Sequence, residues 1–371
     1  MSVTTLPPNG DWWGQYAIWG AVGSTRAGRI FFGMSSNDDS AGGSAHLYEF
    51  NPATEAFADR GTVVQELDRL GVRRPRETQH KIHSRIVEAA DGFLYFSSMD
   101  ENGEADDGSK LPTFGGHLWR RGPSGPWEHL KATPEALIAV AAGGPYVYSL
   151  GYFNHVLYQF DTRTKRIRFV VVGSAGGHVS RNFFVDDRGH AVVPRIVRTS
   201  PTAASATLVE FDAELTEIGS QPLAEYFESI PDDSHGIVGV VADGARGWFF
   251  TTAKGRLYRE QPNLSGRSTV TDLGWLHPAG QRYPAAMFRD EQTGMLYAVS
   301  MPSHGGGKEF EWITRAADGT TTVSPFPYGA SREFPHGALV YGSMARDAAG
   351  RFYAVGTMET KPLVLQITPT R

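Results

Sequence analysis

Short apolar and aromatic segments recur along the chain, and each follows a polar turn that contains glycine. Seven segments share this pattern: 27–32, 91–96, 143–148, 187–192, 246–250, 293–297 and 349–353. Their glycines recur roughly every fifty residues, from Gly28 to Gly350. A repeat of this length predicts a stack or ring of similar units.

A second apolar strand follows in most repeats, at 46–50, 117–120, 156–161, 208–212 and 257–259. Segments 51–54 and 161–165 then have the polar composition of hairpin turns that lead to a further outer strand. Four short antiparallel strands in each of seven repeats predict an all-β fold, a seven-bladed β-propeller around a central channel, formed by one domain over 1–371. A turn-rich β-sandwich is the alternative fold.

The two ends of the chain are expected to close the ring together. The last repeat ends after three strands near residue 368, so closure borrows an N-terminal strand, either 2–6 or 17–21. Helical periodicity is weak throughout, and only 63–70 and 134–140 are candidates for a helix.

The composition agrees with a turn-rich fold and narrows the chemistry. The 371 residues include 43 glycines, 22 prolines and no cysteine. Without cysteine there is no disulfide scaffold, zinc–thiolate site, iron–sulfur cluster or cysteine nucleophile. The net charge of −5 argues against nucleic-acid or membrane-surface binding through overall charge. No apolar run is long enough to predict a membrane span. The first ten residues lack the features of a signal peptide, so a cytoplasmic location is expected.

Histidines recur at one position of the repeat. The inner strands of all blades start at the same mouth of the channel, so residues at equivalent positions converge there. His83, His178, His235 and His336 each precede the Asp of a glycine turn by eight to eleven residues, and Tyr283 holds this position in the sixth repeat. The sequence therefore predicts a polar site at this mouth. Neutral imidazole is both a good metal ligand and a suitable general base.

Three of these histidines, His178, His235 and His336, are candidate ligands for a divalent metal (Ca, Mn or Zn) near the axis. A polar pocket without metal is the equal alternative, and no organic cofactor is expected. Around His178, the sequence also presents Arg181 or Ser180 near the axis.

In the second repeat, the alternation of side chains along the inner strand predicts which of them reach the channel. Residues 79, 81, 83 and 85 share one face of an extended strand. His83 and Arg85 are therefore expected to face the channel, whereas Ile82 and Ile86 pack between blades.

Short motifs resemble those of the seven-bladed propeller polysaccharide lyases. They are Lys81-Ile82-His83, the Asp-Gly-Phe-Leu-Tyr-Phe segment at 91–96, the Gly-Gly-His-Leu-Trp-Arg segment at 115–120, and 179–189. The family includes ulvan lyases and enzymes that release rhamnose from glucuronate, with oligogalacturonate lyase a more distant analogue. The resemblance implies β-elimination at a uronic acid of an acidic oligo- or polysaccharide.

The resemblance also implies roles for individual residues. His83 would be the base that removes the C5 proton, and Arg181 the cation that neutralises the sugar carboxylate. Tyr152 is the candidate acid for the leaving oxygen, and His178 is a further catalytic candidate. The candidate substrate-binding residues are Gln79, His80, Arg85, His117, Arg195, Arg198 and Tyr283. The expected partner is an acidic carbohydrate.

Two other function classes stay open. A propeller can bind a protein or peptide on one face without chemistry, and a metal-dependent hydrolase or lactonase would use channel carboxylates and calcium. The inner strands start with His, Arg and Tyr rather than Asp, Glu and Asn, which argues against the lactonase. A structural role fits His117 as well as a catalytic one, because histidine precedes the same strand in two other repeats. Trp12, Trp13 and Trp19 could stack on sugars, although aromatic packing between blades is commoner.

Overall fold

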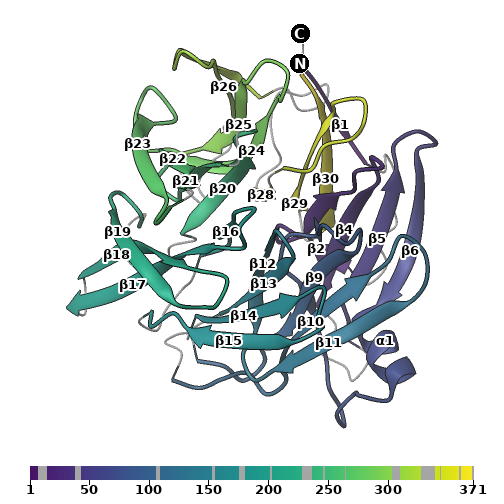
Figure 1. The fold of residues 1–371 in the computed structure, drawn as a ribbon. Helices are drawn as coiled ribbons and strands as arrows, with labels where there is room; N and C mark the ends of the chain where they lie inside the picture. Colours follow the sequence, from purple (N-terminus) through teal and green to yellow (C-terminus); the bar gives the residue numbers. More distant parts are fainter. Residues whose placement is uncertain are drawn as a thin grey trace.

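Seven antiparallel sheets stand around one axis and form a seven-bladed β-propeller (Figure 1). This computed structural model describes residues 1–6, 15–37, 43–105, 109–152, 155–174, 180–200, 203–227, 236–244, 247–263, 265–302, 310–326, 339–342, 344–358 and 361–369. The all-β propeller predicted from the repeat is confirmed, in place of the β-sandwich.

Each blade begins with its inner strand at the axis and ends with its outer strand at the rim; in blades 1 and 2 two short pieces share the inner position. Blade 1 contains β2 (Gln15–Ala17), β3 (Val22–Ser24), β4 (Ile30–Ser36), β5 (His46–Asn51) and β6 (Ala56–Thr62). Blade 2 contains β7 (Lys81–Ile82), β8 (Val87–Glu88), β9 (Leu94–Asp100), β10 (Gly115–Arg121) and β11 (Trp127–Thr133). Blade 3 contains β12 (Leu137–Gly143), β13 (Tyr146–Gly151), β14 (Val156–Asp161) and β15 (Ile167–Val171).

The other four blades have four strands each. Blade 4 contains β16 (Phe184–Val185), β17 (Ala191–Ser200), β18 (Ala203–Phe211) and β19 (Glu217–Leu223). Blade 5 contains β20 (Ile237–Ala242), β21 (Trp248–Thr252), β22 (Arg256–Gln261) and β23 (Thr269–Trp275). Blade 6 contains β24 (Tyr283–Arg289), β25 (Leu296–Met301), β26 (Glu311–Arg315) and β27 (Thr321–Pro325). Blade 7 contains β28 (Leu339–Tyr341), β29 (Phe352–Met358), β30 (Lys361–Thr368) and β1 (Ser2–Thr5).

The repeated glycine turn joins the inner strand of a blade to its second strand, and two positions show why glycine is needed. Gly189 has a φ of +83° and Gly350 a φ of +82°, in the left-handed region that disfavours other residues. A Cβ atom on Gly189 would also lie 2.4 Å from the ring of Tyr146 in the neighbouring blade. The turn therefore demands both the backbone freedom and the small size of glycine.

The ring closes by pairing the two ends of the chain. Strand β1 lies antiparallel to β30 as the outer strand of blade 7, with Ser2 opposite Thr368 and Thr5 opposite Leu365. The amide of Leu6 extends this ladder by donating to the carbonyl of Val364 at 2.9 Å. Of the two closing strands expected from the sequence, residues 2–6 are therefore the one used. The first and last strands of the chain, β1 and β30, accordingly lie side by side (Figure 1).

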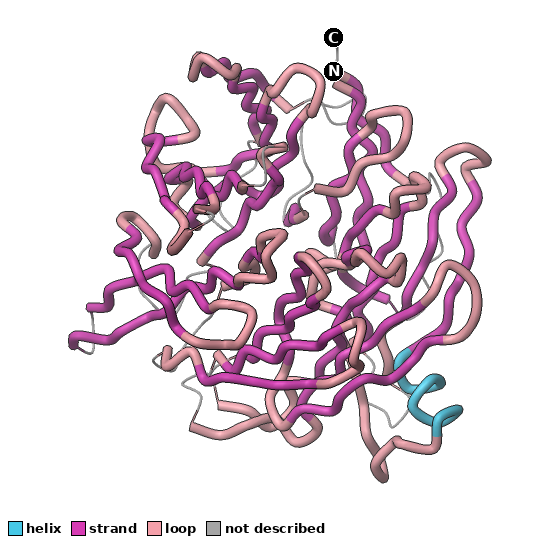
Figure 2. Tube along the Cα trace, in the orientation of Figure 1, coloured by secondary structure: helices cyan, strands magenta, loops and turns pink. Residues whose placement is uncertain are grey.

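One of the two helix candidates is a helix and the other is a strand. Helix α1 (Val63–Leu70), cyan in Figure 2, begins after Thr62, whose hydroxyl accepts from the Gln65 amide, and ends at Gly71 in the left-handed conformation. The expectation of a helix over 134–140 is wrong, because Leu137–Gly143 is β12, an inner strand. Its continuous apolar run suits a strand that is covered on both faces. In the described part of the chain, no helix is long and apolar enough to cross a membrane.

Aromatic side chains fill the spaces between neighbouring blades. Phe288 of blade 6 stacks on Phe352 of blade 7 with ring centres 4.8 Å apart, and Phe184 of blade 4 meets Phe250 of blade 5 at 5.2 Å. Such pairs bury large apolar areas and hold each blade at a fixed angle to the next. This packing sets where the inner strands place their side chains.

Deleting residues 1–6 is expected to lower the free energy of unfolding by roughly 3 kcal/mol, because the edge of β30 is uncovered and the partly buried Met1, Val3 and Leu6 are lost. Urea unfolding followed by circular dichroism measures the change. Ser2→Ala, at an exposed position of the same strand, is the control and should leave stability unchanged. An unchanged midpoint after the deletion would contradict the closing role of β1.

Candidate functional site

A narrow cavity lies on the propeller axis, where side chains from six blades meet. It leaves about 20 Å³ for the centre of a water molecule, which suits one small group such as a carboxylate but not a whole sugar ring. The residues that line it are Trp19, Gly20, His83, Arg85, Arg181, Asn182, Val238, Tyr283, Ala285, Tyr341 and Gly342.

His83 and Arg85 reach this cavity because the inner strand of blade 2 is interrupted. β7 ends at Ile82 and β8 begins at Val87, and both pieces pair with β9. Ile82 and Ile86 lie in the core, as the alternation of the sequence predicts. The expectation that His83 and Arg85 face the channel is confirmed.

His83 and Arg181 lie in contact across the axis. The Nη1 atom of Arg181 is 3.3 Å from Nε2 of His83 and also donates to the carbonyl of Trp19 at 3.0 Å. A guanidinium has donors only, so Nε2 of His83 must be the acceptor and carries a lone pair. The Arg181 guanidinium lies 4.5 Å from the ring centre of Tyr341, a cation–π contact that fixes its plane. A neutral imidazole and a cation therefore lie together in the cavity.

Arg85 crosses the axis below this pair. From blade 2 it donates to the carbonyl of Phe183 in blade 4 at 3.1 Å, and its Nη1 lies 2.9 Å from the sulfur of Met344 on the blade 7 side. Burial lowers the pKa of Arg85 to about 10, which still leaves it charged at neutral pH. The guanidinium adds a second positive charge to the floor of the cavity.

Asn182 is a cavity residue that the sequence did not single out. Its Nδ2 donates to the carbonyls of Ile237 at 3.2 Å and Val238 at 2.9 Å, which ties blade 4 to blade 5. Its buried Oδ1 has no hydrogen-bond partner among the described residues. This oxygen is an acceptor available to a ligand hydroxyl. Asn182 lies in the 179–189 motif, just before β16, but has no predicted role, and Tyr341 ends the short inner strand β28, which has no motif. Their place in the ring identifies both as cavity residues.

The remaining residues predicted for the site are distributed as follows. Tyr283, at the start of β24, lines the cavity. Gln79 is used inside blade 2, where Ser98 donates to its Oε1 at 2.7 Å and its Nε2 donates to the carbonyl of Gly115. His80 is buried, with Nδ1 3.5 Å from the side-chain nitrogen of Asn102. His178, His235 and His336 lie outside the described residues, as do Trp12 and Trp13.

Tyr152, Arg195 and Arg198 do not line the axial cavity. Tyr152 follows β13, the second strand of blade 3, and packs in the core between blades 3 and 4. Arg195 and Arg198 lie on β17. The Nη2 atom of Arg195 is 2.7 Å from the carboxylate of Glu217 on β19. A position on a second strand places these side chains away from the axis.

His117 lies in a buried chain of polar groups within blade 2. Its Nε2 is 3.0 Å from Oε1 of Glu77, and its Nδ1 is 2.9 Å from Nε2 of His129. Burial raises the pKa of Glu77, but hydrogen bonds from His117 and Arg74 outweigh burial and lower the pKa to about 2. Burial, together with His117, lowers the pKa of His129 to about 4. The arrangement agrees with the structural role for His117.

Asp186, His190 and Glu210 in blade 4 form a second polar cluster, and these three residues could hold a metal ion, since their candidate ligand atoms lie within 4.8 Å of one another. A cation already lies among them: Nε of Arg188 is 2.7 Å from Asp186, and its Nη2 is 3.2 Å from Glu210. His190 Nδ1 is 2.9 Å from Glu210. A metal would therefore compete with Arg188.

Glu260 on β22 faces this cluster, and its side chain is completely buried. Burial, with smaller contributions from the nearby Asp186 and Glu210, outweighs the hydrogen bond from Ser268 and raises the pKa of Glu260 to about 7. Near neutral pH, this carboxyl group costs stability when it ionises.

Glu260→Gln is expected to stabilise the protein at pH 8 by about 2–3 kcal/mol and to have little effect at pH 4. The pKa of Glu260 is about 7 in the folded chain against an ordinary value of 4.5, so the unfolded state ionises first. The free energy of unfolding therefore falls as pH rises from about 4.5 to 7. The glutamine side chain does not ionise, so the variant does not show this fall. Urea unfolding of both proteins at the two pH values measures it.

Glu210→Gln is the matched control, because the carboxylate of Glu210 is held by Arg188, His190 and the amide of Ser268 at 2.7 Å. It should destabilise the protein at pH 8. A Glu260→Gln gain that is equal at both pH values would contradict the assignment.

Comparison with known proteins identifies the fold and no family. No protein-family model matches the chain, and no curated protein matches it. The β-propeller domain of Myceliophteria thermophila Cps50 (Swd1) is 12% identical, with 99% of this chain and 100% of that chain covered and a TM-score of 0.57. The structure of U3-55K is 9% identical, with 99% and 98% covered and a TM-score of 0.57.

A fungal alcohol oxidase in complex with copper is 11% identical, with 100% of this chain and 76% of that chain covered and a TM-score of 0.56. Similarity at such low identity shows a shared propeller fold alone, and these three proteins differ widely from one another. Any function must therefore be argued from the residues of this chain.

Proposed function

We propose that the axial cavity is the active site of a carbon–oxygen lyase that cleaves an acidic oligosaccharide at a uronic acid by β-elimination. The observation that carries the proposal is the contact of 3.3 Å between Nε2 of His83 and the guanidinium of Arg181. A base whose nitrogen carries a lone pair and a carboxylate-binding cation are the two groups that this reaction needs side by side.

The reaction balances without a cofactor or water. The sugar carboxylate takes the two parallel N–H groups of Arg181, which frees Nε2 of His83 to accept the C5 proton. The C5–H electrons pass through an enolate-like intermediate, held by Arg181 and Arg85, into a C4–C5 double bond. The C4–O bond breaks, and its oxygen takes a proton from an acid. The products are an unsaturated uronide and a new hydroxyl group.

Tyr283 is the acid in this proposal. It lines the cavity together with His83, whereas Tyr152 does not. The other cavity tyrosine, Tyr341, lies with its ring against Arg181 and 6.0 Å from that of Trp19. This contact suits Tyr341 to holding Arg181 in place.

The size and the rim of the cavity fit a sugar that inserts only its carboxylate. Trp19 is partly exposed, and the ammonium of Lys81 lies 5.9 Å from its ring centre. An aromatic face next to a cation can stack on a sugar ring and attract its neighbouring acidic groups. Oδ1 of Asn182 can accept a hydrogen bond from a ring hydroxyl.

His83→Ala is expected to lower kcat by about a thousandfold, since a general base contributes about 10²–10⁴. Arg181→Lys should raise KM and lower kcat, because the bidentate contact is lost. The ultraviolet absorbance of the conjugated product, with ulvan, pectic and arabinogalactan-type oligosaccharides, measures both.

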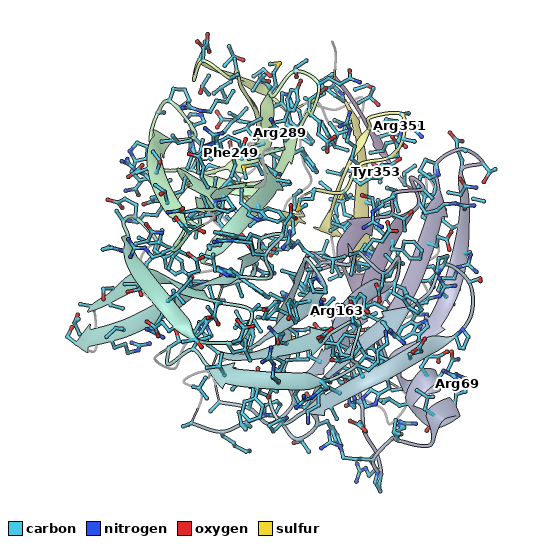
Figure 3. All side chains as sticks on the ribbon, viewed as in Figure 1. Arg69, Arg163, Phe249, Arg289, Arg351 and Tyr353 are labelled. Atoms are coloured by element: carbon cyan, nitrogen blue, oxygen red, sulfur yellow. The ribbon has the colours of Figure 1, made fainter. Side chains whose placement is uncertain are left out.

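Arg163→Gln, at an exposed arginine in the turn between β14 and β15 (labelled in Figure 3), is the matched control and should keep full activity. Full activity of His83→Ala would refute the base. The absence of product on every substrate would favour a propeller that binds without chemistry.

Tyr283→Phe is expected to lower kcat by at least tenfold and to leave KM nearly unchanged, because the phenol acts on the leaving oxygen. The same measurement on Tyr152→Phe separates the two candidate acids. A loss of kcat in Tyr152→Phe alone would assign the role of the acid to Tyr152 instead.

A further inference from the structure

A second hollow lies at the opposite end of the axis, where the inner strands finish. It consists of two adjoining cavities of about 300 and 410 Å³, which share Ser24, Thr25, Arg26 and Met344. Arg85 lines both the axial cavity and the smaller of these two, so its side chain forms the boundary between the two ends. The hollow is therefore separate from the site that contains His83.

Two arginines, Arg289 and Arg346, line the wall of the larger cavity. The Nε atoms of Arg289 and Arg346 are buried and have no hydrogen-bond partner in the described parts of the chain. The guanidinium of Arg289 comes no closer to a carboxylate than 4.0 Å, at Asp243. The guanidinium of Arg346 lies 5.9 Å from the ring centre of Phe352 and forms no ion pair with a described residue.

The carboxylates around the larger cavity do not neutralise these two charges. Asp347 is fully engaged by Arg351 at 2.6 Å, by the hydroxyl of Tyr353 at 2.8 Å and by two backbone amides. Glu291 is exposed at the rim. Asp243 is held by Arg259 at 2.6 Å. The lining of the larger cavity therefore has three arginines, Arg26, Arg289 and Arg346, against two carboxylates.

Aromatic packing also holds the two guanidiniums in place. Phe288 directly precedes Arg289 and is stacked against Phe352 with an angle of 12° between the rings. Arg346 follows β28 in blade 7 and packs on the same Phe352. Arg26 adds a third guanidinium at the edge, held by the carbonyl of Ala89 at 3.0 Å and by Glu88. Figure 3 labels Arg289 at the end of β24.

We propose that this hollow binds a doubly charged tetrahedral oxyanion, a phosphate or sulfate group, between Arg289 and Arg346. Each guanidinium presents five N–H donors in a planar fork that matches such an oxyanion. The bound oxyanion accepts the hydrogen bonds that the chain itself does not supply. The remaining volume accommodates the small molecule that carries the group. The site does not depend on the proposed lyase activity.

Titration calorimetry at constant ionic strength tests the proposal, with sodium phosphate, sodium sulfate and sodium chloride as probes. Phosphate or sulfate should bind the unmodified chain, and chloride should not. The double variant Arg289→Gln/Arg346→Gln should lose at least tenfold in affinity. Glucose 6-phosphate and glucose 6-sulfate, compared in the same way, distinguish a phosphoester from a sulfated sugar as the source of the group.

Arg163→Gln and His83→Ala are the controls and should bind the anion like the unmodified chain. Circular dichroism verifies that the double variant folds; if it does not, the single variant Arg346→Gln, at a partly exposed position, replaces it. Equal affinity of the arginine variants and the unmodified chain would overturn the proposal, as would the absence of binding by both phosphate and sulfate.

Discussion

The pairing of β1 with β30 is the constraint on which the rest of the molecule depends. Blades are alike in strand order, and each buries its apolar faces only against its two neighbours. A ring of such blades has no free face once the first and last are joined, and the join here is a short ladder near Thr368. Only in a closed ring do the inner strands of six blades meet at one cavity. The contact of His83 with Arg181 is therefore a consequence of closure as much as of sequence.

The sequence predicts the periodic features of the molecule well, because they depend on local chemistry. Glycine turns, strand order and the alternation that turns His83 and Arg85 to the channel all follow from positions a few residues apart. The helix candidate at 134–140, which is largely strand β12, shows the limit of such reasoning, since a short apolar run has no period that separates a helix from a strand covered on both faces. Burial by the neighbouring blades decides that this segment is a strand.

The composition of the candidate site was harder to predict, because its contacts join residues far apart in the chain. His117 has a catalytic appearance in the sequence, yet its partners are Glu77 and His129, which only the folded blade brings together. Tyr152 directly follows a second strand and does not line the axial cavity. Asn182, in the 179–189 motif, and Tyr341, outside any motif, become recognisable as site residues only when the ring places them beside Arg181.

Arg85 gives the axis a property that follows from its position alone. Its guanidinium reaches from blade 2 to Phe183 and Met344, and so it lies across the axis between the axial cavity and the second hollow. Among the described residues, this one side chain is shared by the two cavities, so a ligand at one end changes its surroundings at the other. On the proposed function, only the carboxylate of a uronide enters the cavity, while the rest of the glycan stays outside the mouth. The cavity would then select for a carboxylate on the sugar and place no limit on the length of the chain on either side of it.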